Sequence, residues 1–115
     1  MCQAHRSGDE PGRIALMYLV VFRSRKRADH DPAAYSEHAQ AMETLARAQP
    51  GFLAVKTYAA PDGETVTISE WATREAAKAW RCHPDHAAVQ GEGRNAHYAL
   101  YTMFTCLDPE VTQFP

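Results

Sequence analysis

Residues 71–101 read WATREAAKAWRCHPDHAAVQGEGRNAHYALY, and this stretch decides the fold. It contains both tryptophans of the chain and three of its six histidines. The spacing predicts a strand that ends at Trp71, a helix over residues 73–82, a short helix over residues 84–90 and a final strand. A proline disfavours a helical residue before it but suits a first helical turn, so Pro84 separates the two helices. We expect these elements to line one cavity.

The residues before this stretch supply the other elements of a single domain. The apolar run IALMYLVVF at residues 14–22 predicts a strand that is buried on both faces. Asp31 and Pro32 have the residue types of a helix start, and the helix is expected to end at a Gln-Pro-Gly sequence. Two further strands, residues 52–58 and 64–71, are joined by a turn that contains an Asp-Gly pair.

The last strand, residues 96–106, completes the order strand, helix, strand, strand, helix, strand. This order predicts a ferredoxin-like α+β sandwich, with both helices on one face of an antiparallel sheet. We expect Tyr98 to share a face of this strand with Leu100, and Tyr101 to lie on the opposite face with His97. Residues 13–108 are expected to form the domain, residues 1–12 a flexible N-terminal extension and residues 109–115 a C-terminal tail.

The first and last strands carry large apolar side chains on both sides, whereas two helices cover only one face of a sheet. If about six to eight such side chains stayed in water, more than about 10 kcal/mol of burial would be lost. The net stability of a domain of this size is about 5–15 kcal/mol. We therefore expect a second copy of the chain to cover the open face in a two-fold homodimer.

Charge and composition exclude some classes of partner. The chain has 115 residues and a formal net charge of −2, which gives no reason to expect binding to nucleic acid or to an anionic membrane. The basic run at residues 23–27 is expected to be a solvated strand end and loop. Three cysteines without a CxxC pair, an N-terminus without a signal-peptide pattern and the lack of a long apolar run indicate reduced thiols and a cytoplasmic protein.

Three segments together resemble the antibiotic biosynthesis monooxygenase superfamily. They are PGFLAVKTY at residues 50–58, ISEWATREAAKAW at residues 68–80 and HPDHAAVQGEGRNAHYALY at residues 83–101, with an Asp-Gly turn between the first two. The resemblance covers about residues 13–108. It implies a dimeric α/β-barrel and leaves the substrate open, because function is determined by the site rather than by the fold.

The resemblance includes an anthrone-oxidising type that needs no cofactor, in which a dry pocket stabilises a substrate anion that reacts with dioxygen. The tryptophan of that type falls on Trp71. Its asparagine and tyrosine fall on Thr67 and Ala77, and its arginine falls near Gly91, close to Arg94. One of four positions matches.

The superfamily also contains a haem-degrading type. The helix tryptophan of that type corresponds to Trp80, but its proximal histidine falls on Gln90 and its asparagine falls in the aliphatic residues 19–21. His86 lies one helical turn before Gln90 and is the alternative axial ligand. Haem binding is therefore an alternative to cofactor-free chemistry.

The hypothesis favoured by these observations is a cofactor-independent monooxygenase that acts on a small phenol, quinol or anthrone-like substrate. His86 is the expected base, since a neutral imidazole accepts a proton near pH 7, and Arg94 is the expected anion stabiliser beside Trp71. No metal is expected, because His83 and His86 lack enough convergent ligands. The expected substrate-binding residues are Trp80, Tyr18, Tyr98, Tyr101 and Gln90.

Two other interpretations stay open. The tryptophans are most simply core residues, since an indole is mainly apolar surface with one N–H that needs a partner. A dimeric module that binds an apolar small molecule or haem without turning it over would also explain the poor match to both catalytic sets.

Overall fold

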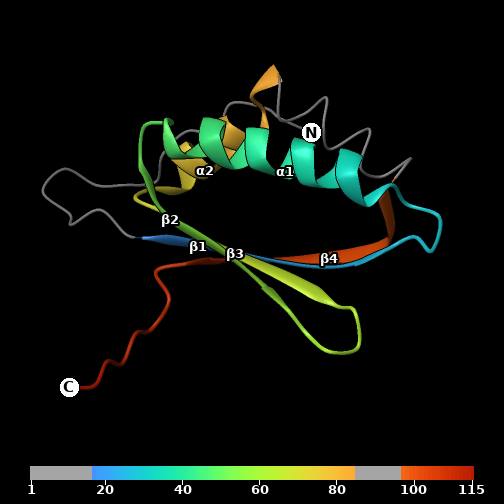
Figure 1. Cartoon of the computed structure of the whole chain (residues 1–115). Helices are drawn as coiled ribbons and strands as arrows, with labels where there is room; N and C mark the ends of the chain where they lie inside the picture. The colour runs from blue at the N-terminus through green and yellow to red at the C-terminus, as the bar shows by residue number, and fades with distance from the viewer. Residues whose placement is uncertain (1–16, 85–96) are drawn as a thin grey trace, which may run out of the picture.

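A computed structural model describes residues 17–84 and 97–115 of the chain. The four strands form one antiparallel sheet in the order β2-β3-β1-β4, and both helices lie on the same face of it (Figure 1). The predicted ferredoxin-like fold is therefore confirmed, while the short helix predicted over residues 84–90 falls almost entirely outside the described residues. The elements are β1 (Tyr18–Lys26), α1 (Pro32–Arg47), β2 (Phe52–Ala59), β3 (Thr65–Trp71), α2 (Arg74–Arg81) and β4 (Tyr98–Leu107).

Both helices begin at the residues that the sequence predicts. The carboxylate of Asp31 accepts hydrogen bonds from the backbone N–H groups of Ala33 and Ala34 at the start of α1. The hydroxyl of Thr73 accepts one from the N–H of Ala76 at the start of α2. These side chains satisfy N–H groups that have no partner within the helix.

The turn between α1 and β2 passes close to α2. Gly51 has a φ of +82°, and a Cβ atom at this position would lie 2.6 Å from the Cβ of Ala76. The carbonyl of Gly51 accepts a hydrogen bond of 2.7 Å from the N–H of Ala72. Glycine is required here both by the left-handed backbone and by the absence of space for a side chain.

Strand β1 extends to Lys26, so most of the basic run lies within the sheet rather than in a loop. The guanidinium of Arg23 pairs with Glu64 at 3.0 Å, and that of Arg25 pairs with Asp62 at 2.8 Å. A backbone N–H and then the Arg25 guanidinium lower the pKa of the Asp62 carboxyl below its ordinary value. The cationic side chains of β1 thus meet acids of the β2–β3 hairpin.

The pairing of β1 with β4 shifts register between Arg25 and Lys26. As a result, the rings of Tyr98 and Tyr101 both contact Phe22, at centroid distances of 5.5 and 5.1 Å. The prediction that these two tyrosines lie on opposite faces of the strand is wrong, because regular alternation does not continue through the irregularity.

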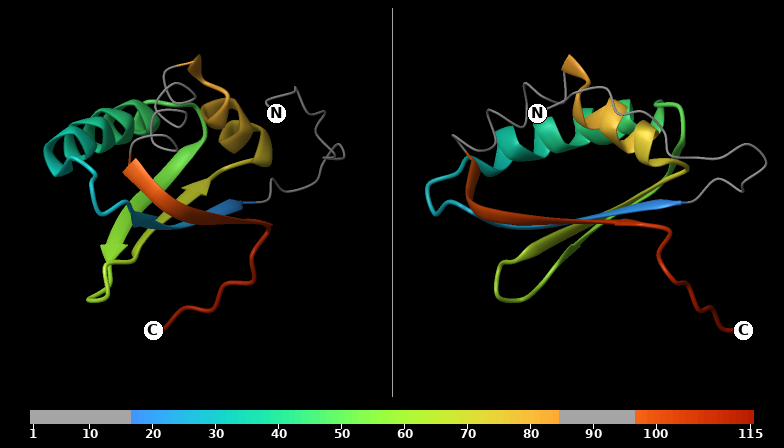
Figure 2. Two further views of the ribbon diagram at one scale, coloured as in Figure 1. Left: turned by 90° about the vertical axis from the view of Figure 1, so that its right-hand side faces the viewer. Right: turned by 180° about the vertical axis from the view of Figure 1, so that it is seen from behind.

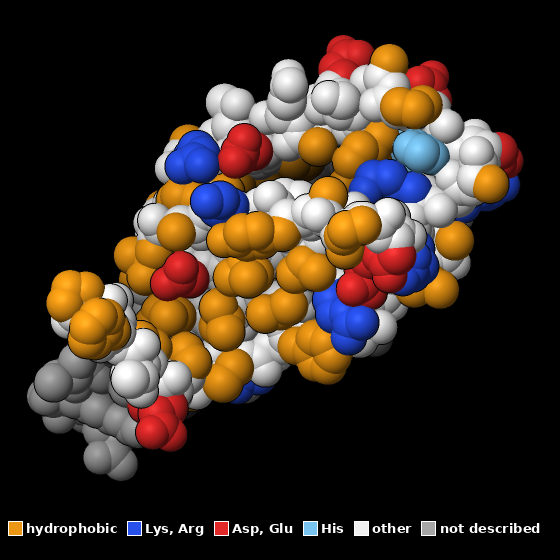
Figure 3. Space-filling view, turned by 60° about the horizontal axis from the view of Figure 1, so that its bottom comes forward, with side chains coloured by type: hydrophobic (Ala, Val, Ile, Leu, Met, Phe, Trp, Pro, Cys, Tyr) orange, Lys and Arg blue, Asp and Glu red, His pale blue; other side chains and the backbone are white. Residues whose placement is uncertain are grey.

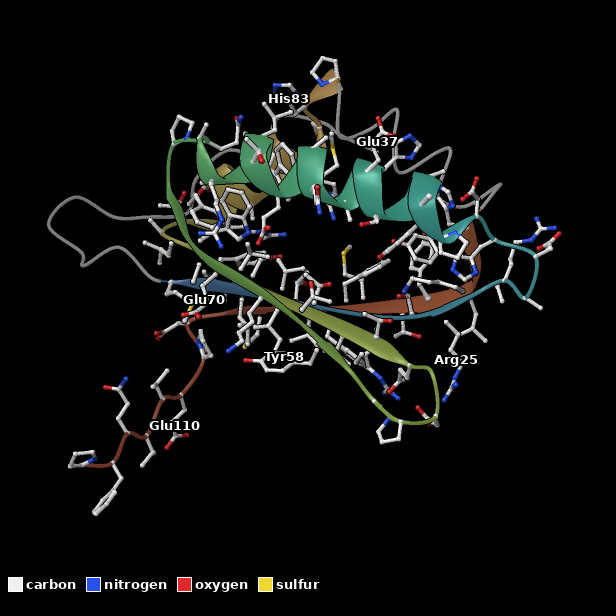
Figure 4. All side chains as sticks on the ribbon, in the orientation of Figure 1. Arg25, Glu37, Tyr58, Glu70, His83 and Glu110 are labelled. Carbon is white, nitrogen blue, oxygen red and sulfur yellow. The ribbon has the colours of Figure 1, made fainter. Side chains whose placement is uncertain are left out.

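The face of the sheet opposite the helices is open in the described chain (Figure 2). Tyr58 points away from the helices (Figure 4) and is half exposed. On β4, Leu100 and Phe104 are 56% and 51% exposed. Apolar side chains gather over this face, with charged groups around them (Figure 3). Among the described residues, no helix is both long and apolar enough to cross a membrane.

Candidate functional site

The interior layer, meaning the side chains between the helices and the sheet, contains two aromatic groups. The first is the tryptophan cluster of Tyr18, Phe52, Trp71, Ala77 and Trp80, which lies against α2. Trp71 is 1% exposed and stacks on Trp80 at a centroid distance of 6.4 Å. Phe52 meets Trp71 edge-on at 5.6 Å. This arrangement is that of a packed hydrophobic core.

The indole N–H of Trp71 already has a partner within the sheet. It donates a hydrogen bond of 3.2 Å to the hydroxyl of Ser69, two residues earlier on β3. An indole with a satisfied N–H and almost no exposed surface contributes mainly to packing. To donate to a ligand, Trp71 would have to exchange this bond.

The second group is the histidine–tyrosine cluster of Phe22, Tyr35, His38, His97 and Tyr98, which joins α1 to the beginning of β4. The hydroxyl of Tyr98 donates to the hydroxyl of Tyr35 at 3.4 Å. Nε2 of His97 lies 3.4 Å from Nδ1 of His38. The ring of Tyr35 meets those of His97 and Tyr98 edge-on, at 5.5 and 5.9 Å.

The hydroxyl of Tyr98 is suited to donating a hydrogen bond, not to accepting a proton as a base. Burial, followed by the hydrogen bond to Tyr35, raises the pKa of Tyr98 well above its ordinary value. The ammonium of Lys26 lies 4.4 Å from the centroid of the Tyr35 ring and donates to the hydroxyl of Thr65 at 2.9 Å. A cation therefore borders this end of the interior layer.

His97 is the most enclosed polar group of the cluster. Its side chain is 5% exposed, and its Nδ1 atom is buried without a hydrogen-bond partner among the described residues. Leaving a buried polar atom unpaired costs about 1–3 kcal/mol. Most buried polar side-chain atoms do have a partner; among the described residues, Nδ1 of His97 and Nε of Arg74 on α2 are exceptions, and Nδ1 of His97 could bond to a further polar group.

Those predicted site residues that the structure describes fall into two separate groups. Trp71, Trp80 and Tyr18 belong to the tryptophan cluster, whereas Tyr98 belongs to the other cluster. Tyr18 and Tyr98 lie near opposite ends of the β1–β4 pairing. Tyr101 contacts Phe22 and Tyr98 but is 41% exposed. His86, Gln90 and Arg94 lie outside the described residues.

His38 and His97 were not identified from the sequence as site residues. On α1, His38 is partly buried, whereas the adjacent Ala39 is exposed. The spacing of Tyr35, His38, Met42 and Leu45 at three- and four-residue steps is the signal that would have identified His38. His97 carried no comparable local signal, since its partner lies 59 residues away.

The described chain also has a groove along α1, and its described residues contain no candidate metal site. An open groove of about 680 Å³ runs along α1, lined by Glu37, Gln40, Ala41, Met42, Thr44, Leu45 and Ala48. Glu37 points away from the sheet (Figure 4), whereas Met42 and Leu45 of this lining are partly buried. Within residues 17–84 and 97–115, no three His, Cys, Asp or Glu side chains are placed to hold a metal ion.

The cysteines differ from the expectation of reduced thiols at one position. Cys106 is an exposed free thiol. Cys82, at the end of α2, is disulfide-bonded, and its partner is not among the described residues. The prediction is therefore wrong for Cys82.

Known proteins resemble this chain in sequence and in fold. The uncharacterized protein YqjZ of Bacillus subtilis is 37% identical over 86 residues, which cover 75% of this chain and 74% of that protein. Rv0793 from Mycobacterium tuberculosis superposes with a TM-score of 0.73 at 20% identity, over 84% of this chain and 99% of that one. SnoaB, a cofactor-independent oxygenase from Streptomyces nogalater, gives a TM-score of 0.69 at 18% identity, over 88% and 99% of the two chains.

Two departures from the anthrone-oxidising pattern can now be placed in the structure. The hydroxyl of Thr67 lies 2.9 Å from that of Thr57 in a cross-strand pair. Ala77 is the buried residue of α2 and belongs to the tryptophan cluster. The family model for antibiotic biosynthesis monooxygenases nevertheless matches residues 17–92, which is about two thirds of the sequence. The fold, the tryptophans and this match lead to one conclusion: the chain belongs to the antibiotic biosynthesis monooxygenase family.

Proposed function

We propose that this protein is a cofactor-independent monooxygenase that uses dioxygen to oxidise a small aromatic substrate with an ionisable hydroxyl, such as a phenol, quinol or anthrone. The observation that carries the proposal is the histidine–tyrosine cluster inside a fold of the monooxygenase family. Phenol and imidazole groups meet there among aromatic rings. A structural relative, SnoaB, is described as a cofactor-independent oxygenase, which supports the same class of reaction.

The cluster has the chemical groups that this reaction needs. An electron-rich substrate anion reacts with dioxygen, so the protein must bind an aromatic ring, accept its hydroxyl proton and stabilise the negative charge. The rings of Phe22, Tyr35 and Tyr98 offer apolar and edge contacts to a planar ligand. The hydroxyl of Tyr35 accepts from Tyr98, which leaves its own proton available for donation to an oxyanion.

The proposal also includes the roles predicted from the sequence, both for described residues and for residues outside the described ranges. In it, Arg94 binds the substrate oxyanion and His86 assists proton removal. Trp71 and Trp80, with Tyr18, form the wall at the α2 end. Tyr101 and Gln90 complete the substrate contacts.

The reaction can be tested with an oxygen electrode and purified full-length protein. Dithranol, an anthrone, and 1,4-naphthohydroquinone serve as trial substrates. We expect oxygen uptake that persists after dialysis against EDTA and that falls at least tenfold in Arg94→Ala. If neither compound causes uptake above its spontaneous oxidation, the proposed activity is wrong.

The open sheet face supports the proposal of a homodimer. Half-exposed apolar side chains occupy it, including Tyr58, Leu100 and Phe104. An identical face on a second copy is self-complementary in a two-fold arrangement and would remove this apolar surface from water.

Light scattering after size exclusion should give twice the chain mass. Phe104→Glu should give a monomer, whereas Ala39→Glu, on an exposed side of α1, should not.

A non-catalytic binding module is the second candidate function. The observation that favours it is the state of Trp71, whose N–H is bound to Ser69 and whose side chain is enclosed. In this case the interior layer would bind an apolar molecule or haem without oxidising it. A shift of the Soret band on titration with haemin would support haem binding, and its absence together with oxygen uptake on dithranol would exclude this candidate.

A further inference from the structure

Two imidazoles face each other where α1 meets the start of β4. The resemblance to the family assigned no role to either of them. Nε2 of His97 and Nδ1 of His38 are 3.4 Å apart, with ring centroids at 5.6 Å. His97 is buried, whereas His38 is only partly buried on α1. The pair therefore connects an enclosed position in the interior layer with the helix that borders solvent.

The unpaired Nδ1 atom of His97 determines the direction in which a proton can pass between the two rings. In a neutral pair, the proton between the rings belongs to Nε2 of His97 or to Nδ1 of His38. The second arrangement would leave a buried N–H on His97 without an acceptor among the described residues. Buried donors without partners are rarer than buried acceptors without partners. The first arrangement is therefore favoured, and it leaves a lone pair on Nδ1.

The groups around the pair are poor competitors for a proton. Tyr35 faces it from α1, Tyr98 adjoins it on β4, and the ammonium of Lys26 on β1 lies over the Tyr35 ring. Tyrosine has an ordinary pKa near 10, and burial raises that of Tyr98 further. A protonated lysine accepts no proton. Imidazole, with an ordinary pKa near 6.5, is the base in this group that works at neutral pH.

We propose that the His97–His38 pair is the proton acceptor for the hydroxyl of a bound phenol, quinol or anthrone. The O–H bond of the substrate breaks and an N–H bond forms at Nδ1 of His97, while the proton on Nε2 passes to Nδ1 of His38. The substrate becomes an anion and the pair becomes a cation, so the net charge is unchanged. No oxidation or reduction takes place in this step. Passing the charge to His38 places it nearer to solvent, which lowers the cost of desolvation.

This inference rests on the proposed function, but it concerns a step that precedes any reaction with dioxygen. Nδ1 is closed off in the ligand-free chain, and contacts between a base and its substrate commonly form only once the substrate is bound. The step can therefore be observed without oxygen and without turnover.

The experiment uses 4-nitrophenol, whose anion absorbs strongly, mixed anaerobically with the full chain near pH 7 in weak buffer, where an ordinary imidazole is mostly neutral. We expect the anion to appear on binding while a pH indicator reports no release of protons, because the pair keeps the proton. An anion stabilised by an arginine alone would release one proton for each anion formed. That second result, or the absence of anion with both 4-nitrophenol and dithranol, would overturn the proposal.

Three variants separate the roles of the two rings. His97→Gln should abolish the anion signal while ligand affinity, measured by dialysis, changes less than about threefold. His38→Gln should reduce the signal by roughly tenfold and shift its pH midpoint, since the charge then stays on the buried ring. His83→Gln is the matched control, because His83 lies above the helix layer and away from the sheet (Figure 4), and it should behave as the unmodified protein.

Oxygen uptake distinguishes this inference from the proposed function. General base catalysis contributes about 100- to 10,000-fold, so His97→Gln should lower the uptake rate with dithranol at least 100-fold. If the anion forms without proton release but oxygen is not consumed, the acceptor pair stands and the monooxygenase assignment fails. If oxygen is consumed at an unchanged rate by His97→Gln, the assignment stands and the acceptor pair is wrong.

Discussion

The tryptophan cluster and the histidine–tyrosine cluster occupy the same interior layer but differ in chemistry. At the α2 end, stacked indoles and small residues fill the space, and the indole N–H of Trp71 donates to Ser69. At the α1 and β4 end, ionisable rings meet edge-on, and Nδ1 of His97 is buried without a partner among the described residues. The first cluster stabilises the fold, and the second has unsatisfied hydrogen-bonding capacity that a ligand can use.

The largest expected effect is a loss of stability at the tryptophan cluster. Trp71→Ala removes an almost fully enclosed side chain, and such substitutions cost about 3–5 kcal/mol of unfolding free energy. His97→Phe keeps an aromatic ring at this position and should change stability by less than about 1.5 kcal/mol. Urea denaturation followed by circular dichroism measures both. Equal losses would remove the distinction between the two clusters.

A smaller loss is expected where the α1–β2 turn meets α2. Gly51→Ala forces a side chain into a left-handed position, which costs about 1–2 kcal/mol, and against Ala76, which adds about 1–3 kcal/mol. Gly63 also has a positive φ, of +92°, but no atom lies within 4 Å of its added Cβ. Gly63→Ala therefore serves as the control and should show the first cost alone. A similar shift in the urea midpoint of both variants would contradict the close approach.

The smallest effect at neutral pH is expected at Tyr98. Its pKa is higher in the folded chain than in the unfolded one, so its contribution is present below about pH 10 and is lost as the pH rises further. The unmodified protein should thus lose stability above about pH 10, and Tyr98→Phe should lose less over the same range. Tyr58→Phe, a half-exposed tyrosine on the open face, is the matched control. Parallel curves for Tyr98→Phe and the unmodified protein would argue against burial as the cause.

The parts of the fold that depend on local signals could be predicted from the sequence. Asp31 and Thr73 cap the helices because short polar side chains satisfy free N–H groups wherever they precede a helix. The antiparallel sheet with both helices on one face followed from the order of strands and helices along the chain. The tryptophan cluster was recognisable because both tryptophans adjoin predicted elements and resemble a family pattern.

The histidine–tyrosine cluster could not be predicted in the same way. It depends on a register shift between Arg25 and Lys26, which period-two alternation does not reveal. Its histidines and tyrosines come from α1 and from residues 97–98 at the start of β4, and tertiary packing brings them together across about 60 residues of sequence. The residues predicted as base and anion stabiliser, His86 and Arg94, lie outside the described ranges, so their roles stay predictions.

The same register shift has a consequence for protein engineering. Along residues 100–107, regular pairing with β1 fixes which side chains of β4 enter the apolar interior. A shift of one residue there would disturb the whole sheet. On the other side of the shift, His97 and Tyr98 do not follow this alternation, and both contact Tyr35 of α1 although they are consecutive residues. A mutant library confined to these two positions and their partners on α1 would vary the reactive groups while leaving the strand pairing unchanged. The scaffold thus offers a place to install new chemistry without redesigning its core.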